Sequence, residues 1–147
     1  VRMFAEPVRE LERLHAGERA WSGMTLEDES KTLEGLSGGV FDIRATIEPN
    51  DADFCGFELG DCSVTYDRRK GELRCGKNTA PLAPVEGAIT LQLLVDRLSV
   101  EIFSNGGRVY MPMAHVFEST EAPVEVFAKG GACNFAELKV FELKSAW

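Results

Sequence analysis

Apolar and polar residues alternate along most of the chain, and this period of two predicts β-strands. Between Phe41 and Ile47 every second residue is apolar, and the residues between them are Asp, Arg and Thr. Further strands are predicted over residues 54–59, 62–66, 72–76, 89–95, 99–104, 108–113, 124–128 and 135–143. Clusters of Gly, Asn, Asp and Pro separate these segments and are typical of turns.

The pair 89–95 and 99–104 predicts a specific register. If residues 96–99 form the turn, Val95 lies opposite Val100 and Leu93 lies opposite Ile102. The branched apolar side chains then share one face, as a buried sheet face requires, while Glu101 and the residues in step with it share the other. The following Asn-Gly-Gly at 105–107 is typical of another hairpin turn.

Three segments depart from the strand pattern. Residues 77–87 hold two prolines and a glycine, which predicts a connecting loop. Residues 129–131, Lys-Gly-Gly, are predicted to turn the chain between its last two strands. Residues 7–15 carry an apolar residue at every third position, and a short helical turn or an extended linker fits them equally well.

About ten short strands with a turn every eight to twelve residues or so predict a β-sandwich or barrel. The 147 residues suffice for one domain with a sizeable core. We therefore predict an all-β fold, an antiparallel β-sandwich of two packed sheets with a jelly-roll or lectin-like arrangement.

Composition removes several classes of partner. With 16 basic and 24 acidic residues the net charge is −8, so no basic surface for nucleic acid is expected. The apolar stretches are far too short to span a membrane. No Cys-x-x-Cys pair occurs and there are only two histidines, so neither a metal site nor another cofactor is predicted.

The cysteines and the start of the chain bear on its location. Four cysteines occur, at Cys55, Cys62, Cys75 and Cys133. They fit reduced core residues of a cytoplasmic protein, and two disulfides in a secreted protein are the alternative. The sequence starts Val-Arg-Met-Phe and shows no signal peptide, although a start at Val1 suggests a fragment.

No catalytic residue is predicted from the sequence. There is no Gly-x-Ser-x-Gly elbow and no phosphate loop. His115 stands alone at a strand exit, which favours a solvated side chain over a catalytic base. Asp96 and Glu101 are close in sequence, but an Asp that opens a turn usually accepts backbone N–H groups. Two aromatic residues, Trp21 and Tyr110, are candidate sugar contacts, because sugar rings stack on exposed aromatic faces.

Residues 91–107, Leu-Gln-Leu-Leu-Val-Asp-Arg-Leu-Ser-Val-Glu-Ile-Phe followed by Ser-Asn-Gly-Gly, resemble a family signature. The segment is similar to the C-terminal β-sandwich of glycoside hydrolase family 32, which includes invertases, levanases, inulinases and sucrose-6-phosphate hydrolases. Asp96, Arg97, Glu101 and Phe103 match the signature, as do the Ser and Val at positions 99 and 100. Leu98 replaces a usual serine.

The resemblance implies that the catalytic part, a five-bladed β-propeller, is missing. Residues 1–16 would then be the linker that leaves the propeller, and residues 17–147 would be the accessory domain. The family's motifs Asn-Asp-Pro-Asn, Arg-Asp-Pro and Glu-Cys are absent, and Asn-Asp-Ala-Asp at 50–53 lacks the proline of the first. The parent enzyme would cleave β-fructofuranosyl bonds with retention, using two carboxylates of the propeller.

The prediction is therefore a non-catalytic domain that supports the propeller, with a homodimer as a secondary expectation. Two alternatives stay open. One is a carbohydrate-binding module for fructan or sucrose, which would use Trp21 or Tyr110. The other is an independent small enzyme, whose carboxylates would be Asp96 and Glu101.

Overall fold

A computed structural model describes residues 15–34, 36, 40–96, 99–105, 109–114 and 124–143. These residues form ten strands, all paired antiparallel: β1 (His15–Thr32), β2 (Phe41–Glu48), β3 (Phe54–Leu59), β4 (Cys62–Asp67), β5 (Glu72–Cys75), β6 (Asn78–Pro81), β7 (Ile89–Val95), β8 (Ser99–Ser104), β9 (Val109–Ala114) and β10 (Val124–Leu143). Within this part of the chain, no helix has the length and apolar character needed to cross a membrane.

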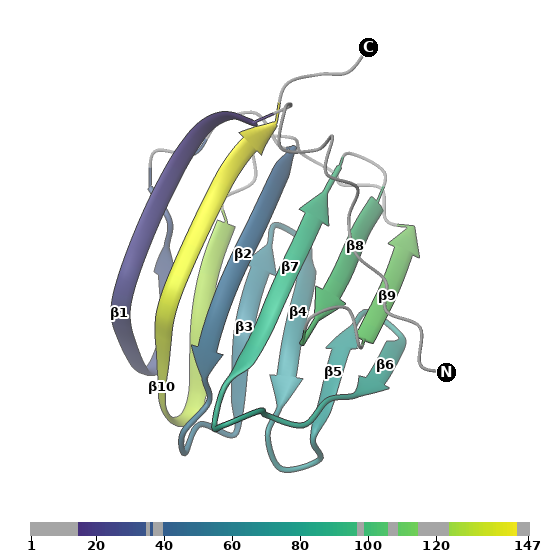
Figure 1. Cartoon of the computed structure of the whole chain (residues 1–147). Coiled ribbons are helices and arrows are strands. Elements are labelled where there is room, and N and C mark those ends of the chain that lie inside the picture. Colours follow the sequence, from purple (N-terminus) through teal and green to yellow (C-terminus); the bar gives the residue numbers. More distant parts are fainter. Residues whose placement is uncertain are drawn as a thin grey trace.

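The strands form two layers that share their longest members. The back layer of Figure 1 runs in the order β6-β5-β4-β3 and continues into residues 124–129 of β10. The front layer begins with residues 134–142 of β10 and continues through β2, β7, β8 and β9. Strand β1 follows β10 through both layers. The all-β antiparallel sandwich is thus confirmed, and its continuous long strands make it nearly a closed barrel.

The passage of β10 from one layer to the other depends on two glycines. Gly130 and Gly131 have φ angles of 74° and 139°, which L-residues with a side chain rarely adopt. On the neighbouring strand, Asp28 has a φ of 47° and its Oδ1 accepts the Gly130 N–H at 2.6 Å. Asp51 Oδ1 accepts the Ala132 N–H at 2.9 Å from the other side. The bend is therefore held by side chains as well as by backbone conformation.

Two sequence-based predictions need correction, and one strand was missed. Residues 129–131 do not end a strand, because β10 runs unbroken from Val124 to Leu143. The predicted loop 77–87 contains the short edge strand β6, whose terminal Pro81 is tolerated because an edge strand needs fewer ladder donors. Strand β1 was not predicted. It begins at His15, inside the predicted linker, and the rest of that linker up to residue 14 lies outside the described residues.

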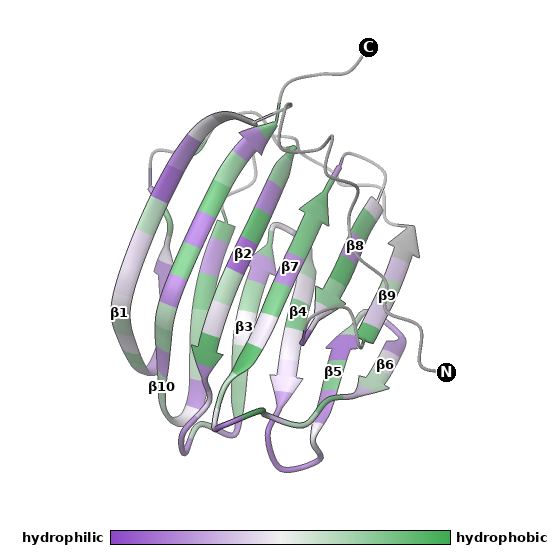
Figure 2. Ribbon diagram, in the orientation of Figure 1, coloured by the Kyte–Doolittle hydropathy of each residue, from purple (hydrophilic) through white to green (hydrophobic). Residues whose placement is uncertain are grey.

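The predicted register of β7 and β8 is confirmed. Val95 pairs with Val100 and Leu93 pairs with Ile102. Leu93 and Ile102 are fully buried, as is Ile43 on the next strand. The alternation of apolar and polar residues along these strands is visible in Figure 2. It places one apolar face of each layer against the other, and the core lies between them.

All four cysteines are free and buried in the core. The Sγ atoms of Cys62 and Cys75, on neighbouring strands, lie 3.7 Å apart. A hydrogen bond with Cys62 and burial raise the pKa of the Cys75 thiol above its ordinary value of 9.0. A hydrogen bond with Cys55 and burial do the same for the pKa of Cys133.

These shifts predict a loss of stability in alkaline solution. Burial also raises the pKa of the Tyr66 phenol above 10.0. Since the folded pKa values lie above the unfolded ones, the unfolded chain loses protons first, and the free energy of unfolding falls as pH rises above 9.0. Urea titrations between about pH 7 and pH 10.5 measure this fall, and Tyr66→Phe should make it shallower. A free energy of unfolding that stays constant over this range would contradict the prediction.

Candidate functional surface

The front layer carries a mixed aromatic and charged surface on the face that points away from the core. We call it the outer face. One row across it contains Phe141, Asp42, Leu94, Glu101 and Pro112, and the next row contains Lys139, Arg44, Gln92, Phe103 and Tyr110. The alternating residues of the same strands point into the core.

Asp42 is the buried charge of this surface. Its exposed fraction is 0%, although it lies on the side away from the core. Arg44 donates to Asp42 from Nη2 at 2.8 Å and from Nε at 3.3 Å, and Gln92 Nε2 donates to Oδ1 at 3.0 Å. These bonds offset the cost of removing the carboxylate from water. The Arg44 guanidinium also lies 5.1 Å from the centre of the Phe141 ring. The network holds four side chains of three strands in fixed positions.

An aromatic pair forms the β8–β9 end of the surface. The rings of Phe103 and Tyr110 have centroids 4.9 Å apart, and their planes meet at 30°. Tyr110 is 44% exposed, and its hydroxyl donates to Glu101 Oε1 at 3.0 Å. That hydrogen bond is the main reason why the pKa of Tyr110 is raised above 10.0. The exposed aromatic ring is thus fixed by two neighbours.

The two candidate sugar contacts lie far apart. Tyr110 is on the outer face, whereas Trp21 pairs with the buried Leu138 and packs in part against the core. Strands β10, β2, β7 and β8 lie between β1 and β9, which places the two side chains about 25 Å apart. The two aromatic residues therefore belong to different sites.

The residues of the family signature lie at different places in the structure. Glu101 and Phe103 lie on the outer face, as the predicted register of 89–104 requires, but sequence reasoning did not foresee that they meet Tyr110 there. The Asp96 N–H donates to the Ser99 carbonyl at 2.9 Å and closes the turn between β7 and β8. Arg97 and His115 lie outside the described residues.

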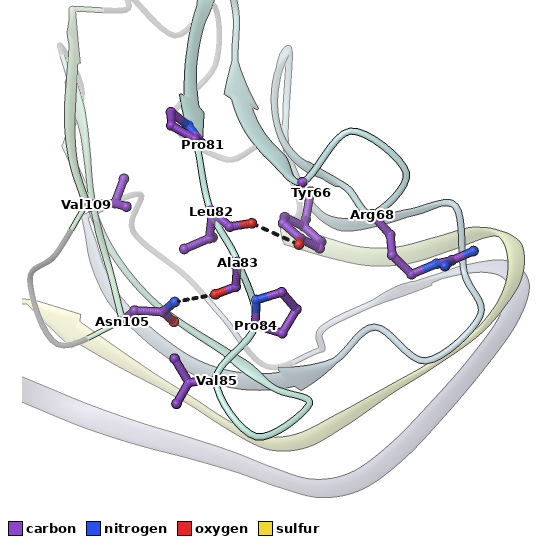
Figure 3. Close-up of a pocket in the computed structure, with 10 residues that line it drawn as sticks. Tyr66, Arg68, Pro81, Leu82, Ala83, Pro84, Val85, Asn105 and Val109 are labelled. Carbon is purple, nitrogen blue, oxygen red and sulfur yellow. Dashed lines mark hydrogen bonds between the residues drawn. The ribbon is translucent and has the colours of Figure 1, made fainter.

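A pocket of about 810 Å³ opens where β6 and β9 approach each other (Figure 3). The Tyr66 hydroxyl donates to the Leu82 carbonyl at 2.9 Å, and Asn105 Nδ2 donates to the Ala83 carbonyl at 2.9 Å. Asn105 Oδ1 also accepts the Thr90 N–H at 3.1 Å. Asn105, which the sequence marked only as a turn residue, thus ties the loop after β6 to β7. These polar groups hold the pocket wall together.

The carboxylates close to the bend of β10 at Gly130 and Gly131 also form hydrogen bonds or ion pairs with other residues of the chain. Asp51 accepts the Ala132 N–H, and Asp53 Oδ1 lies 3.4 Å from Arg68 Nη2 and 3.6 Å from Arg69 Nε. The aspartates of the segment Asn-Asp-Ala-Asp at 50–53 therefore have a structural role and fix the loop between β2 and β3. Among the described residues, no group of three or more His, Cys, Asp or Glu side chains is arranged to hold a metal ion.

Comparison with known proteins identifies the family to which this β-sandwich belongs. The family profile described as "Glycosyl hydrolases family 32 C terminal" matches residues 10–142. The chain belongs to this family. The resemblance found around residues 91–107 is thereby confirmed, and it extends over nearly the whole chain.

Two curated relatives are named as a levanase and an exo-inulinase. A levanase of Bacillus subtilis (strain 168) is 31% identical over 171 aligned residues, which cover 100% of this chain and 25% of the levanase. An extracellular exo-inulinase of Aspergillus ficuum is 27% identical over 113 residues, covering 71% of this chain and 21% of that protein. The chain thus spans about a quarter of the length of the curated relatives that it matches.

Solved structures show the same fold. An exo-inulinase from Aspergillus awamori matches with a TM-score of 0.78 at 17% identity, over 98% of this chain and 33% of that one. Fructan 1-exohydrolase IIa from Cichorium intybus matches with a TM-score of 0.77 at 13% identity, over 97% and 38%. In both, the matched fold accounts for only part of a longer chain.

Proposed function

We propose that this domain is a non-catalytic accessory domain that supports the catalytic β-propeller of a β-fructofuranosidase. The match to a C-terminal family in chains about four times as long carries the proposal, because it implies a large domain before this one. Four of the described carboxylates support it, because Asp42, Asp51, Asp53 and Asp67 all bind groups of the chain itself.

The parent enzyme would hydrolyse fructans such as levan or inulin, with sucrose as a further substrate class. This proposal rests on the relatives' names, levanase and exo-inulinase. Two carboxylates of the propeller would act as nucleophile and acid/base, with retention at the anomeric carbon. The domain described here would contribute stability rather than a reacting group.

The test compares the longer polypeptide with a version that ends before residue 10. We expect the truncated enzyme to lose fructan hydrolysis at elevated temperature about ten times faster, because a docked domain stabilises the fold to which it binds. Time courses of fructose release after heating measure the two half-lives. Equal half-lives would contradict a supporting role, and fructose release by this chain alone would contradict a non-catalytic one.

A second candidate function is fructan binding, which the exposed Tyr110 ring favours. Aromatic stacking on a sugar face would require that ring to be free. Calorimetric titration of the chain with sucrose, levan and inulin oligosaccharides decides between the two functions. Sub-millimolar affinity that Tyr110→Ala abolishes would establish binding, and a silent titration would leave the supporting role.

A further inference from the structure

We propose that the outer face around Phe103 and Tyr110 is the surface on which the catalytic domain of the same polypeptide docks. This inference rests on the proposed function and specifies which surface the partner covers. The first observation is a difference between the two layers. On the back layer, β4 and β5 turn Ser63, Thr65 and Arg74 away from the core, and the outward aromatic residues Phe54 and Phe127 lie on β3 and β10. The outer face of the front layer instead presents Leu94, Phe103, Tyr110, Pro112 and Phe141.

The second observation is that the side chains of this surface are already fixed. Asp42 holds Arg44 and Gln92, while Glu101 and Phe103 hold Tyr110. A surface of this kind loses little side-chain entropy when a partner covers it. Tyrosine and arginine are also enriched among the residues that dominate protein interfaces. Among the described residues, Tyr110 is the large aromatic side chain with the greatest exposed fraction, 44%. A partner that covers it would therefore remove the most aromatic surface from water.

The third observation is where the preceding part of the polypeptide reaches this domain. Strand β1 starts at His15, which pairs with Leu143 at the end of β10. The pair Glu18 and Phe141, in the first row of the outer face, follows within about 10 Å along the same strands. Because the matched family is C-terminal, a catalytic domain would precede this domain in the polypeptide, and the chain that follows it enters the front layer at this end. Covalent attachment at this end gives the catalytic domain a high effective concentration next to the outer face.

Photo-crosslinking in the longer polypeptide tests the docking surface directly. Tyr110→p-benzoylphenylalanine keeps an aromatic ring on the outer face, and Thr65→p-benzoylphenylalanine places the same probe on the opposite layer as a matched control. We expect irradiation to link position 110, and not position 65, to peptides of the catalytic domain within one chain. Mass spectrometry of the digested protein identifies the linked peptides.

The outcomes separate this inference from the proposed function. Links from position 65 instead of 110, or links from position 110 to a second copy of the chain, would overturn the docking surface. The absence of links from position 110 would also overturn it, and if truncation still shortened the half-life, the supporting role would remain valid. Equal half-lives with and without the domain would remove the proposed function itself.

A charge substitution provides a second measurement in case the bulky probe disturbs folding. Tyr110→Lys can still pair with Glu101, so we expect the sandwich to retain its fold, while an ammonium group beneath the partner is costly to bury. The half-life of fructan hydrolysis at elevated temperature should fall several-fold towards that of the truncated enzyme. Thr65→Lys should leave the half-life within about twofold. Equal effects of the two substitutions would overturn the proposal.

Discussion

Replacing Gly131 with alanine is expected to remove a large part of the stability of this domain. A Cβ atom at this position would lie 2.5 Å from the Asp51 carbonyl oxygen and 2.8 Å from its carbon, and backbone atoms cannot rotate away. The φ of 139° adds strain for any residue other than glycine. We expect a loss of about 3–6 kcal/mol, against a total of about 5–15 kcal/mol for a domain. Urea denaturation followed by tryptophan fluorescence measures the loss.

Gly17→Ala is the matched control because it makes the same chemical change on β1, next to the same long strand. Its new Cβ would lie 4.0 Å from the Glu142 Oε2, an ordinary contact distance. We expect a change within about 0.5 kcal/mol. If both variants unfolded at the same urea concentration, the bend of β10 would not require a glycine at position 131.

The second large effect is expected for Phe135→Ala. Phe135 is fully buried on the front-layer part of β10, and its ring meets that of Phe57 from the back layer edge-on, with centroids 5.9 Å apart. Truncation leaves a cavity between the two layers, which costs about 3–5 kcal/mol. The free energy of unfolding from urea titration gives this value, and the double variant with Phe57→Ala gives the coupling of the pair, about 0.5–1.5 kcal/mol.

Phe141→Ala is the control for this prediction because it makes the same change six residues along β10, on the outer face. Phe141 is only half-buried there and stacks with Arg44. We expect a loss of less than about 1.5 kcal/mol in the domain by itself. A larger loss from Phe141→Ala than from Phe135→Ala would mean that the core does not lie between the two layers as described.

The sequence by itself determined the fold class, because each strand of a sandwich shows its buried face as a period of two. Residues 89–104 are an example. Apolar alternation together with a short turn selects a register in which one apolar face is buried, and the structure has that register. The family resemblance came from the same segment, in which strands that follow one another in the sequence are also neighbours in the sheet.

Sequence patterns failed where pairing between distant segments decides the structure. Strand β1 is rich in charged residues because it lies at an edge and is exposed along most of its length, so only pairing with β10 reveals it as a strand. Lys-Gly-Gly at 129–131 is a turn by composition, yet β10 pairs with β3 before this segment and with β2 after it, so the strand continues through a bend.

The outer face was likewise decided by tertiary structure. Tyr110 could be named as a candidate contact from its residue type, but its exposure and its partners Phe103 and Glu101, which come from the neighbouring strand, follow from the structure. Asp42 shows the limit most clearly. Alternation correctly placed it away from the core, yet it accepts hydrogen bonds both from Arg44 beside it and from Gln92, 50 residues later in the chain. Local patterns specify which side of a strand a residue occupies, whereas its neighbours across strands follow only from long-range pairing.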